Sequence, residues 1–298
     1  MVSWDDLRVF LAVARQESLS AAGRVLRIDP ATVGRRIARL EQAIGQPLFA
    51  KSPLGYALTD AGQRLLPHAE RTEQSTQDAG EALAGVAGKL TGQIRIGAPD
   101  GCANFILPRV CAAMARDNPD LEIQILSLPR IVNLSKREAD LAISVSRPTA
   151  GRLSVQTSTD YALHVAATRS YLDETAPIET VADLRHHRVV GYISDMIFDQ
   201  ELDYLSELQA RRVHLASNSV SVQLNWLRQG GGLGIVHDFA LPYAPELRRI
   251  LTQEVSLQRA FYLVRHADDR RLDRMNRFAE ALVAGMRAEV SRLEALAQ

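Results

Sequence analysis

The sequence predicts an α/β protein in which a small, mainly helical module precedes a larger α/β domain. Three observations carry this prediction. Residues 1–44 repeat apolar side chains at helical spacing, residues 69–90 continue a helical seam, and from Ile94 short apolar runs alternate with helical stretches. The chain has 298 residues, of which 46% are hydrophobic and 23% charged. That length and composition are typical of a folded protein of about two domains.

The N-terminal segment predicts three short helices. Ser3 followed by Asp6 is typical of a helix start, and Ser20 can cap a second helix. Asp29 is a good N-cap and Pro30 suits the first helical position, so a third helix is expected to begin there. The apolar positions of the three helices are Leu7, Phe10, Leu11 and Ala14, then Ala22, Val25 and Leu26, then Val33, Ile37, Leu40 and Ile44.

The third helix carries positive charge on a chain whose formal net charge is zero. Residues 24–39 hold five arginines against one acidic residue. Away from its apolar stripe, the helix presents a second stripe of Thr32, Arg35, Arg36 and Arg39. Arginines on an outer helix face can donate hydrogen bonds to base edges and phosphates of DNA. A solvated helix face that merely carries charges is the alternative.

A turn-containing segment follows the third helix. The stretch "PLFAKSPLGYALT", residues 47–59, has strand-like residues around a Pro/Gly turn, which predicts a small hairpin or wing. Thr59 is expected to cap a further helix. Three helices and a wing together predict a winged helix-turn-helix, a module that binds DNA.

The helix after Thr59 is expected to be long. From residue 69 its seam alternates spacings of four and three, as in a heptad repeat, although the seam residues are small and partly polar. Pro67 is expected to kink this helix, and glycines from residue 85 onward mark a hinge. The seam positions are Ala69, Thr72, Thr76, Ala79, Leu83, Val86 and Leu90.

The remainder of the chain predicts two α/β lobes, with the chain crossing between them twice. Alternating strands and helices are typical of a parallel sheet. Strands are expected in "QIRIGA", "LEIQIL", "ADLAISV", "YALHVAA", "HRVVGYI", "RVHLAS", "GLGIVHD" and "AFYLVRH". Helices are expected near residues 104–117, 130–138, 180–185, 199–208 and 219–229, with a final helix from about residue 268.

Four stretches within residues 1–66 occur in the order of a known family: "FLAVARQESLSAAGRVL", "TVGRRIARLE", "IGQPLF" and "LTDAGQRLL". The chain resembles the LysR-type transcriptional regulators, and "LTGQIRIGAP", "NPDLEIQI", "READLAI" and "GGGLGI" extend the resemblance over essentially all 298 residues. It implies a winged helix-turn-helix at 1–60, a linker and dimerisation helix at 61–91, and an effector-binding domain at 92–298. That domain would have two Rossmann-like lobes, as in periplasmic binding proteins: lobe I at 92–161 and 267–298, and lobe II at 162–266.

The resemblance also implies partners. A regulator of this type binds double-stranded DNA in a sequence-specific way and responds to a small-molecule effector between its lobes. Antiparallel pairing of linker helices would give a homodimer or homotetramer, with packing of that helix on its own domain as the alternative. The candidate DNA-binding residues are Ser20, Pro30, Ala31, Thr32, Arg35, Arg36, Arg39 and Lys51.

Two departures from the family pattern bear on base preference. The usual "SQPA" is "DPAT" here, so Pro30 stands where the family frequently has a glutamine. Gly34 replaces the usual serine before the first arginine, whereas Lys51 stands where an arginine is usual. The base preference of better-known members therefore does not carry over.

The effector pocket is expected at the C-terminal ends of strands, where helix N-termini point. By position, its candidate residues are Pro99, Asp100, Gly101 and Cys102, then Ser127 and Leu128, and from the far lobe Ile193, Ser194, Ser217, Asn218, Ser219 and His237. The family often has small hydroxyl residues in the first loop, suited to a carboxylate. If Asp100 faces the pocket, an anionic effector meets a like charge, so we hypothesise a neutral or cationic effector. Alternatively, Asp100 only caps the helix at residue 103.

Three further sequence features do not predict a nucleotide, disulfide or metal site. "RQGGGLGI" follows a helix and enters a strand, whereas a nucleotide fingerprint needs strand, loop and helix in that order, so Gly230 is expected to end the helix instead. Cys102 and Cys111 are expected to be buried small residues on one helix, too far apart for a disulfide. His186 and His187 make a poor metal pair, and no metal or cofactor is predicted.

Catalytic residue types, cysteine count and targeting segments indicate the class of protein and its compartment. No set of nucleophile, base and orienting acid can be chosen, so an enzyme is not predicted. Two cysteines favour a reducing compartment, and the sequence shows neither a signal peptide nor a run of about 18 apolar residues, so a cytoplasmic protein without membrane contact is expected. The rival reading is a solute-binding protein or enzyme of bilobal α/β architecture with an N-terminal helical extension.

Overall fold

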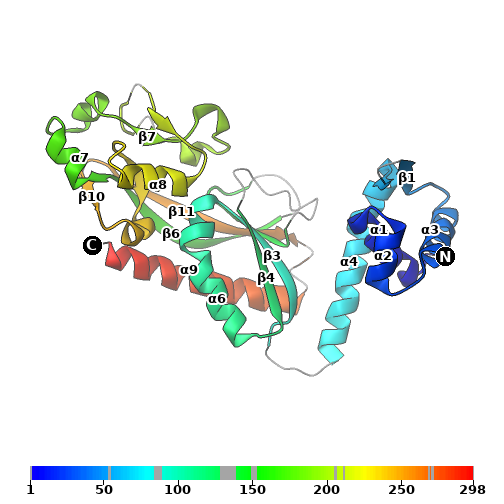
Figure 1. Cartoon of the computed structure of the whole chain (residues 1–298). Helices are drawn as coiled ribbons and strands as arrows, with labels where there is room; N and C mark the ends of the chain where they lie inside the picture. Colours follow the sequence, from blue (N-terminus) through cyan, green and yellow to red (C-terminus); the bar gives the residue numbers. More distant parts are fainter. Residues whose placement is uncertain are drawn as a thin grey trace. The chain divides into compact units, whose positions relative to one another are not determined.

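The computed structural model describes residues 2–52, 55–83, 89–127, 139–148, 153–204, 207–210, 212–267, 269 and 272–297. The chain forms two compact units, Met1–Ala87 and Gly88–Gln298. The first is mainly helical, and the second is built on a sheet flanked by helices (Figure 1). Among the described residues, no helix is long and apolar enough to cross a membrane.

Three short helices and a hairpin share one core in the first unit. Apolar residues of each helix enter this core, where Phe10, Leu11, Leu40 and Leu48 are fully buried. Val25 of α2, expected to point inward, is instead 62% exposed. The unit is the winged helix-turn-helix expected from the sequence. Its elements are α1 (Trp4–Gln16), α2 (Leu19–Leu26), α3 (Pro30–Ile44) and the antiparallel strands β1 (Phe49–Ser52) and β2 (Gly55–Leu58).

Polar residues in front of α2 and α3 fix where these helices begin. The Ser18 side chain accepts a hydrogen bond from the backbone N–H of Ala21 at 3.3 Å, so Ser18 caps α2 and the prediction of Ser20 as its cap is wrong. Asp29 accepts from the backbone N–H of Ala31 at 2.6 Å, as predicted for the start of α3. Each cap satisfies one N–H group that a helix start leaves without an intrahelical partner.

The hairpin is tied to the end of α1. Gly55 opens β2 with a φ of 131°, and a Cβ atom there would lie 2.5 Å from the carbonyl oxygen of Glu17. Tyr56 donates its backbone N–H to that same oxygen at 2.9 Å. Only glycine combines this φ with so close an approach, so Gly55 holds the wing against α1.

The helix after the wing, α4 (Asp60–Leu83), packs its first half on the first unit. It starts where Thr59 accepts a hydrogen bond from the backbone N–H of Gly62 at 3.1 Å, as predicted. Ala69 is fully buried in the core of this unit. Arg15 of α1 donates to Glu73 at 2.6 Å, which ties the next turn of α4 to α1.

The predicted linker seam divides into several parts. Ala69 serves the core of the first unit and is not free to pair with a second copy, whereas Thr76 and Ala79 are exposed. The side chain of Leu83 and all of Val86 lie outside the described residues. Leu90, the last seam position, lies in the core of the second unit.

The second unit is built on a seven-stranded mixed sheet. Strand β3 pairs in parallel with β4 and β5, and β11 pairs antiparallel with both β5 and β6. The far end of β6 pairs antiparallel with β9 and β10. The bounds are β3 (Gly92–Ala98), β4 (Leu121–Ser127), β5 (Leu141–Ser144), β6 (Leu153–Thr168), β9 (Gly234–His237), β10 (Leu247–Ile250) and β11 (Ser256–His266), and a separate parallel pair is formed by β7 (Val190–Gly191) and β8 (Leu215–Ala216).

Strands β6 and β11 run through both halves of this unit. The register between them shifts at Phe261 and Tyr262, which leaves Ser158 as the extra residue of a β-bulge. A bulge bends a strand and increases its twist, so the sheet turns here between the half that holds β3, β4 and β5 and the half that holds β9 and β10. The two predicted lobes are therefore joined by β6 and β11, the two strands that cross between them.

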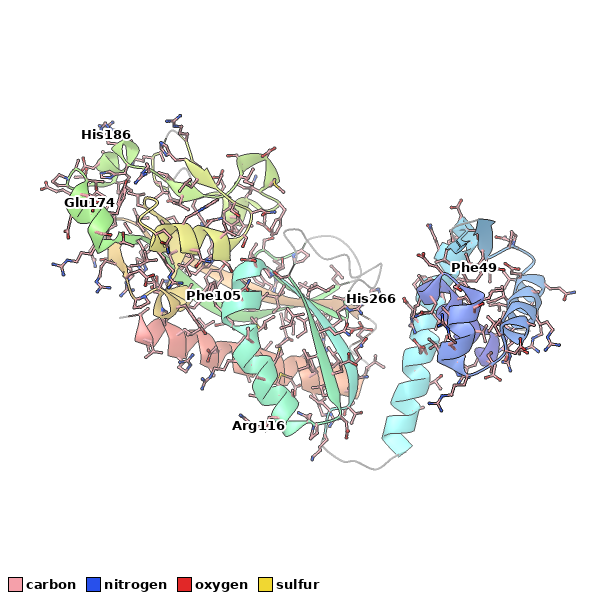
Figure 2. All side chains as sticks on the ribbon, in the orientation of Figure 1. Phe49, Phe105, Arg116, Glu174, His186 and His266 are labelled. Carbon is pink, nitrogen blue, oxygen red and sulfur yellow. The ribbon has the colours of Figure 1, made fainter. Side chains whose placement is uncertain are left out.

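Helices flank this sheet in both halves (Figure 1). Figure 2 places Arg116, near the end of α6, and His186, at the end of η2, at opposite ends of the unit. Between them, Phe105 packs against Tyr243 with ring centroids 5.3 Å apart. The α-helices are α5 (Asp100–Phe105), α6 (Leu107–Asp117), α7 (Arg169–Glu174), α8 (Val220–Arg228) and α9 (Asp273–Leu296), and the 3-10 helices are η2 (Val181–His186), η3 (Ser194–Met196), η4 (Gln200–Leu202) and η5 (Asp238–Tyr243).

Several predicted helices differ from those observed. The helix expected near 104–117 is two helices that meet at Ile106, because Pro108 has no N–H to continue the first of them. In the segment near 199–208, the helical stretch among the described residues is the short 3-10 turn η4, and the segment at 180–185 is the 3-10 helix η2. The helix expected near 130–138 lies outside the described residues.

The glycine-rich stretch ends a helix, as predicted. Gly230 has a φ of 71° directly after α8, and its backbone N–H donates to Leu227 at 2.9 Å. The N–H of Gly231 donates to Trp226 at 2.9 Å, which completes the paired bonds of a Schellman motif. Strand β9 follows, so the order of elements is helix, loop and strand.

Candidate functional site

The outward face of α3 lies opposite its buried residues Val33, Ile37 and Leu40. At about 100° per residue, Arg35 points almost directly away from this apolar stripe. Arg35 is exposed, and it donates to the Thr32 hydroxyl of the same helix at 2.9 Å. Ala31, Ala38 and Gln42 are also exposed on this face. Sequence reasoning missed Ala38 and Gln42 because it followed the positive charges rather than the whole face.

The other two arginines of α3 lean toward α1. Nε of Arg39 donates to Oδ2 of Asp6 at 2.8 Å, and a second guanidinium nitrogen bonds the other carboxylate oxygen. Arg36 lies 3.6 Å from a carboxylate oxygen of Asp5. The side chain of Arg39 is still 61% exposed, and a guanidinium has five N–H donors, so it keeps donors for an external phosphate. The sequence predicts the three arginines on one outward stripe. In the structure, Arg35 points away from the core, whereas Arg36 and Arg39 point toward α1.

The remaining predicted DNA-binding residues occupy the start of this surface. Ser20, Pro30 and Ala31 are exposed, and Thr32 is half-buried. Lys51 belongs to β1, but its side chain lies outside the described part of the chain.

A cavity of about 370 Å³, part of it open to solvent, lies where the two halves of the second unit meet. The half that holds β3 contributes the start of α5, and the other half contributes residues near the start of α8 and the end of β9. The lining residues are Pro99, Asp100, Gly101, Cys102, Val145, Tyr192, Phe198, Leu202, Asn218, Val220, His237 and Phe261.

The predicted effector-binding residues divide by position. Six of them line the cavity: Pro99, Asp100, Gly101, Cys102, Asn218 and His237. Ser219 caps α8, and Ser217 accepts a hydrogen bond from Ser219, so both serve the turn before that helix. Ser127 is exposed at the end of β4, and Ile193 and Ser194 lie at the start of η3, where Ser194 lines a second cavity. Leu128 lies outside the described residues.

Sequence reasoning missed the apolar wall of this cavity. Tyr192, Phe198, Leu202, Val220 and Phe261 come from five different elements or loops. The motif match covers loops that carry hydroxyl or charged groups, and no local pattern marks these apolar residues. Tyr192 and Leu202 also line a second cavity of about 380 Å³ beneath β7, which the sequence did not predict.

The carboxylate of Asp100 bonds the start of α8 and not that of its own helix. Its Oδ2 accepts from the Ser219 hydroxyl at 3.1 Å, the backbone N–H of Ser221 at 3.0 Å and the Ser221 hydroxyl at 3.1 Å. Its Oδ1 accepts from the side-chain amide of Asn104 at 3.1 Å. The expectation that Asp100 merely caps the following helix is wrong, because Pro99 occupies that cap position without a side-chain hydrogen bond.

His237 lies beside Asp100 in an aromatic environment. Its ring centroid is 4.9 Å from that of Phe239 and 5.5 Å from that of Tyr161. Burial lowers the pKa of His237 from 6.5 to about 4, since desolvation disfavours the charged imidazolium. The imidazole is therefore neutral at physiological pH, and its buried Nδ1 has no hydrogen-bond partner in the part of the chain that the structure describes.

The two cysteines are free and buried. Cys102 lies on α5 and Cys111 on α6, so they do not share the single helix that the sequence predicts. Burial raises the pKa of the Cys111 thiol to about 11 and that of Cys102 further. Both thiols are therefore protonated and unreactive, as the expectation of buried small residues implies.

Both units match models of a single protein family. Residues 4–63 match the model described as a bacterial regulatory helix-turn-helix protein of the lysR family, and residues 87–287 match the LysR substrate binding domain. The chain belongs to the LysR-type transcriptional regulators. A LysR-type regulator is a DNA-binding transcriptional regulator with an effector-binding domain, and this excludes the rival reading of a solute-binding protein with a helical extension.

Curated relatives are helix-turn-helix transcriptional regulators. The chain is 38% identical over 151 residues to the transcriptional regulator DgdR of Burkholderia cepacia, covering 49% of this chain and 50% of the relative. It is 28% identical over 232 residues to the transcriptional activator TtdR of Escherichia coli K12, covering 76% of this chain and 75% of the relative.

Solved structures of full-length proteins share the fold. A full-length OxyR variant from Pseudomonas aeruginosa superposes with a TM-score of 0.71 at 17% identity, covering 96% of this chain and 95% of the other. LysG from Corynebacterium glutamicum, solved with a bound effector Arg, gives a TM-score of 0.63 at 18% identity, with 96% and 98% of the chains covered.

Proposed function

We propose that α3 enters the major groove of operator DNA and that Arg35 reads base edges there. The observation that carries this proposal is the direction of Arg35, which points away from the core of its unit and whose hydrogen bond to Thr32 stays within the same helix. A guanidinium in this position can make a bidentate contact to a guanine. Gln42, about two turns further along the same face of α3, can make the equivalent contact to an adenine.

Arg36 and Arg39 serve phosphate contacts in this proposal. Asp5 and Asp6 orient their guanidinium groups, and contacts to the DNA backbone position a protein without specifying sequence. Ser20, Pro30, Ala31 and Thr32 flank the same surface at the start of α2 and α3. Lys51, on the wing, adds a further phosphate contact.

The three-part division of the chain belongs to this proposal. The DNA-binding domain comprises residues 1–60, the linker 61–91 and the effector-binding domain 92–298, with lobe I at 92–161 and 267–298 and lobe II at 162–266. The exposed positions Thr76 and Ala79 of α4 support pairing of two linker helices, since small side chains allow close approach of helix backbones. Light scattering tests the resulting homodimer or homotetramer against the chain mass of 32.8 kDa.

The cavity between Asp100 and His237 is the effector site in this proposal. It lies at the C-terminal end of β3 and between the two halves of the sheet, where α/β folds commonly bind small molecules. A ligand there contacts both halves at once. It would change the angle between them, and so the geometry that the oligomer presents to DNA.

A gel-shift titration with DNA from upstream of the regulator's own gene and of neighbouring genes tests the proposed DNA binding. Binding should weaken steeply between 50 and 200 mM salt, because each phosphate contact releases condensed counterions. Arg35→Ala should relax the preference for the specific site, whereas Arg39→Ala should reduce the salt slope. Specific binding that neither substitution affects would exclude α3 as the recognition helix.

A further inference from the structure

The two halves of the effector-binding domain are linked by one carboxylate. Asp100 belongs to α5, which follows β3 in the first half, whereas Ser219 caps α8 and Ser221 lies in its first turn, in the second half. Three hydrogen bonds of 3.0–3.1 Å join Oδ2 of Asp100 to these serines, and one of them comes from a backbone N–H in the first turn of α8. The neighbouring Gly101 also approaches Val220, since a Cβ on Gly101 would lie 3.5 Å from that side chain.

The start of α8 is a place that favours negative charge. Backbone N–H groups in the first turn lack intrahelical acceptors, and the helix dipole adds partial positive charge. A carboxylate that accepts one of these N–H groups and two serine hydroxyls occupies the position that a bound anion would take. Asp100 therefore fills this position with a group that is covalently part of the chain.

The acceptor capacity of Asp100 is used up by its neighbours. An ionised carboxylate offers about four lone-pair sites. Three donors engage Oδ2, and the amide of Asn104 engages Oδ1 at 3.1 Å. These donors are uncharged, so the carboxylate keeps its negative charge, which repels an entering anion.

His237 lines the same cavity as Asp100 and is only 5% exposed. Its imidazole is neutral at physiological pH, because burial lowers its pKa to about 4. Asp100 is therefore the charged side chain among the described residues that line the cavity. Tyr192, Phe198 and Phe261 add apolar surface.

We propose that Asp100 is a built-in anion at the N-terminus of α8, and that the adjoining cavity therefore binds a neutral or cationic molecule rather than a carboxylate. This inference rests on the proposed effector site. It gives a structural reason for the neutral or cationic effector expected from the sequence, because Asp100 fills the position that a ligand carboxylate would take. Asp100 thus determines which ligand charge the site accepts.

Removal of the Asp100 carboxylate should open the anion position to a free carboxylate. The experiment measures the thermal unfolding of the full-length protein in sodium acetate, with sodium chloride and acetamide at the same concentrations as references. In Asp100→Ala, acetate should raise the Tm of the effector-binding domain by about 2–4 °C above both references. The wild type should show no such difference, because its anion position is filled.

Asp173→Ala is the matched control, since Asp173 is an exposed carboxylate of α7 whose nearest cation, Arg169, lies 3.9 Å away. It should behave like the wild type. If Asp100→Ala does not fold, Asp100→Ser gives the same test with a side chain too short to reach the three donors. An equal acetate effect in the wild type, or no effect beyond chloride and acetamide in the Asp100 variants, would overturn the proposal.

Gel-shift titrations of the same variants separate the two proposals. An acetate effect confined to the Asp100 variants supports the built-in anion even if neither protein binds the chosen DNA. If the wild type does not bind DNA, that result contradicts the proposed recognition surface and leaves the proposal for Asp100 unaffected.

Discussion

The guanidinium of Arg39, on α3, binds the carboxylate of Asp6, on α1, across 33 residues of sequence. Asp6 is buried, with its side chain 3% exposed, whereas the Arg39 side chain is 61% exposed. A bidentate pair of this kind fixes orientation as well as distance. The pair therefore holds the proposed recognition helix against the first helix while leaving part of the guanidinium open to DNA.

Arg39→Ala should lower the stability of the first unit. The substitution leaves the buried Asp6 carboxylate with only the more distant Arg36, at 4.0 Å. Arg35→Ala, which removes a side chain whose hydrogen bond to Thr32 stays within α3, is the control and should leave the Tm nearly unchanged. Trp4 fluorescence in a Trp226→Phe background reports on this unit alone, because the chain has two tryptophans and one lies in each unit. Equal Tm values for the two variants would contradict the role of the pair.

Gly34→Ala should stabilise α3 by about 0.5–1 kcal/mol, because glycine loses more backbone freedom than alanine in a helix interior. The new Cβ would meet the side chain of Leu19 at 3.6 Å, which is an ordinary van der Waals contact. Urea unfolding followed by Trp4 measures the change. Gly23→Ala is the opposite control, since its Cβ would lie 2.7 Å from the carbonyl oxygen of Ile28. A loss of stability in Gly34→Ala would show that α3 has no room there.

His237 should make the second unit less stable in acid. Its pKa is about 4 in the folded chain and 6.5 ordinarily, so between these values the unfolded chain binds a proton that the folded chain does not. Its stabilisation is complete above pH 6.5 and falls as the pH drops toward 4, by about 3 kcal/mol at most. His237→Phe keeps an aromatic ring among Tyr161 and Phe239 and should flatten this part of the pH profile. Urea unfolding followed by Trp226 in a Trp4→Phe background tests this, and parallel profiles for both proteins would exclude it.

Asp238→Ala should destabilise the second unit by about 3–5 kcal/mol, because it leaves two buried or half-buried partners without their acceptor. The Asp238 side chain is 5% exposed and lies 2.9 Å from both Nδ1 of His164 and the guanidinium of Arg249. These three residues join β6, η5 and β10. Asp173→Ala is the exposed control, and calorimetry of the full chain measures both. A change no larger than that of the control would contradict this role.

Local signals predicted the first unit well. Asp29 and Pro30 mark the start of α3, and Val33, Ile37 and Leu40 are its buried residues, because a cap and an apolar period act within one or two turns. The N-terminal capping interaction expected for Ser3 and Asp6 in α1 does not form. Ser3 makes no side-chain cap bond, and Asp6 turns to Arg39, a partner that no local pattern indicates.

Long-range contacts account for most of what the sequence did not predict in the second unit. Asp100 bonds residues 119 and 121 positions later, so its distance from α8 depends on the whole sheet. The first half of β6 carries polar residues such as Ser154 and Gln156, which concealed a strand of 16 residues. The family resemblance placed the pocket loops, whereas the apolar wall around Phe198 depends on packing between elements far apart in sequence.

The affinity of Arg35→Ala for operator DNA tests the central claim most directly. Arg8→Ala is the control, since it removes the same charge from the exposed side of α1. The Arg35 variant should lose about 5- to 150-fold in affinity for its specific site, the equivalent of about 1–3 kcal/mol, with its Tm unchanged. The Arg8 variant should bind nearly as the wild type does. Unchanged specific affinity in Arg35→Ala would contradict the assignment of α3 as the helix that reads DNA.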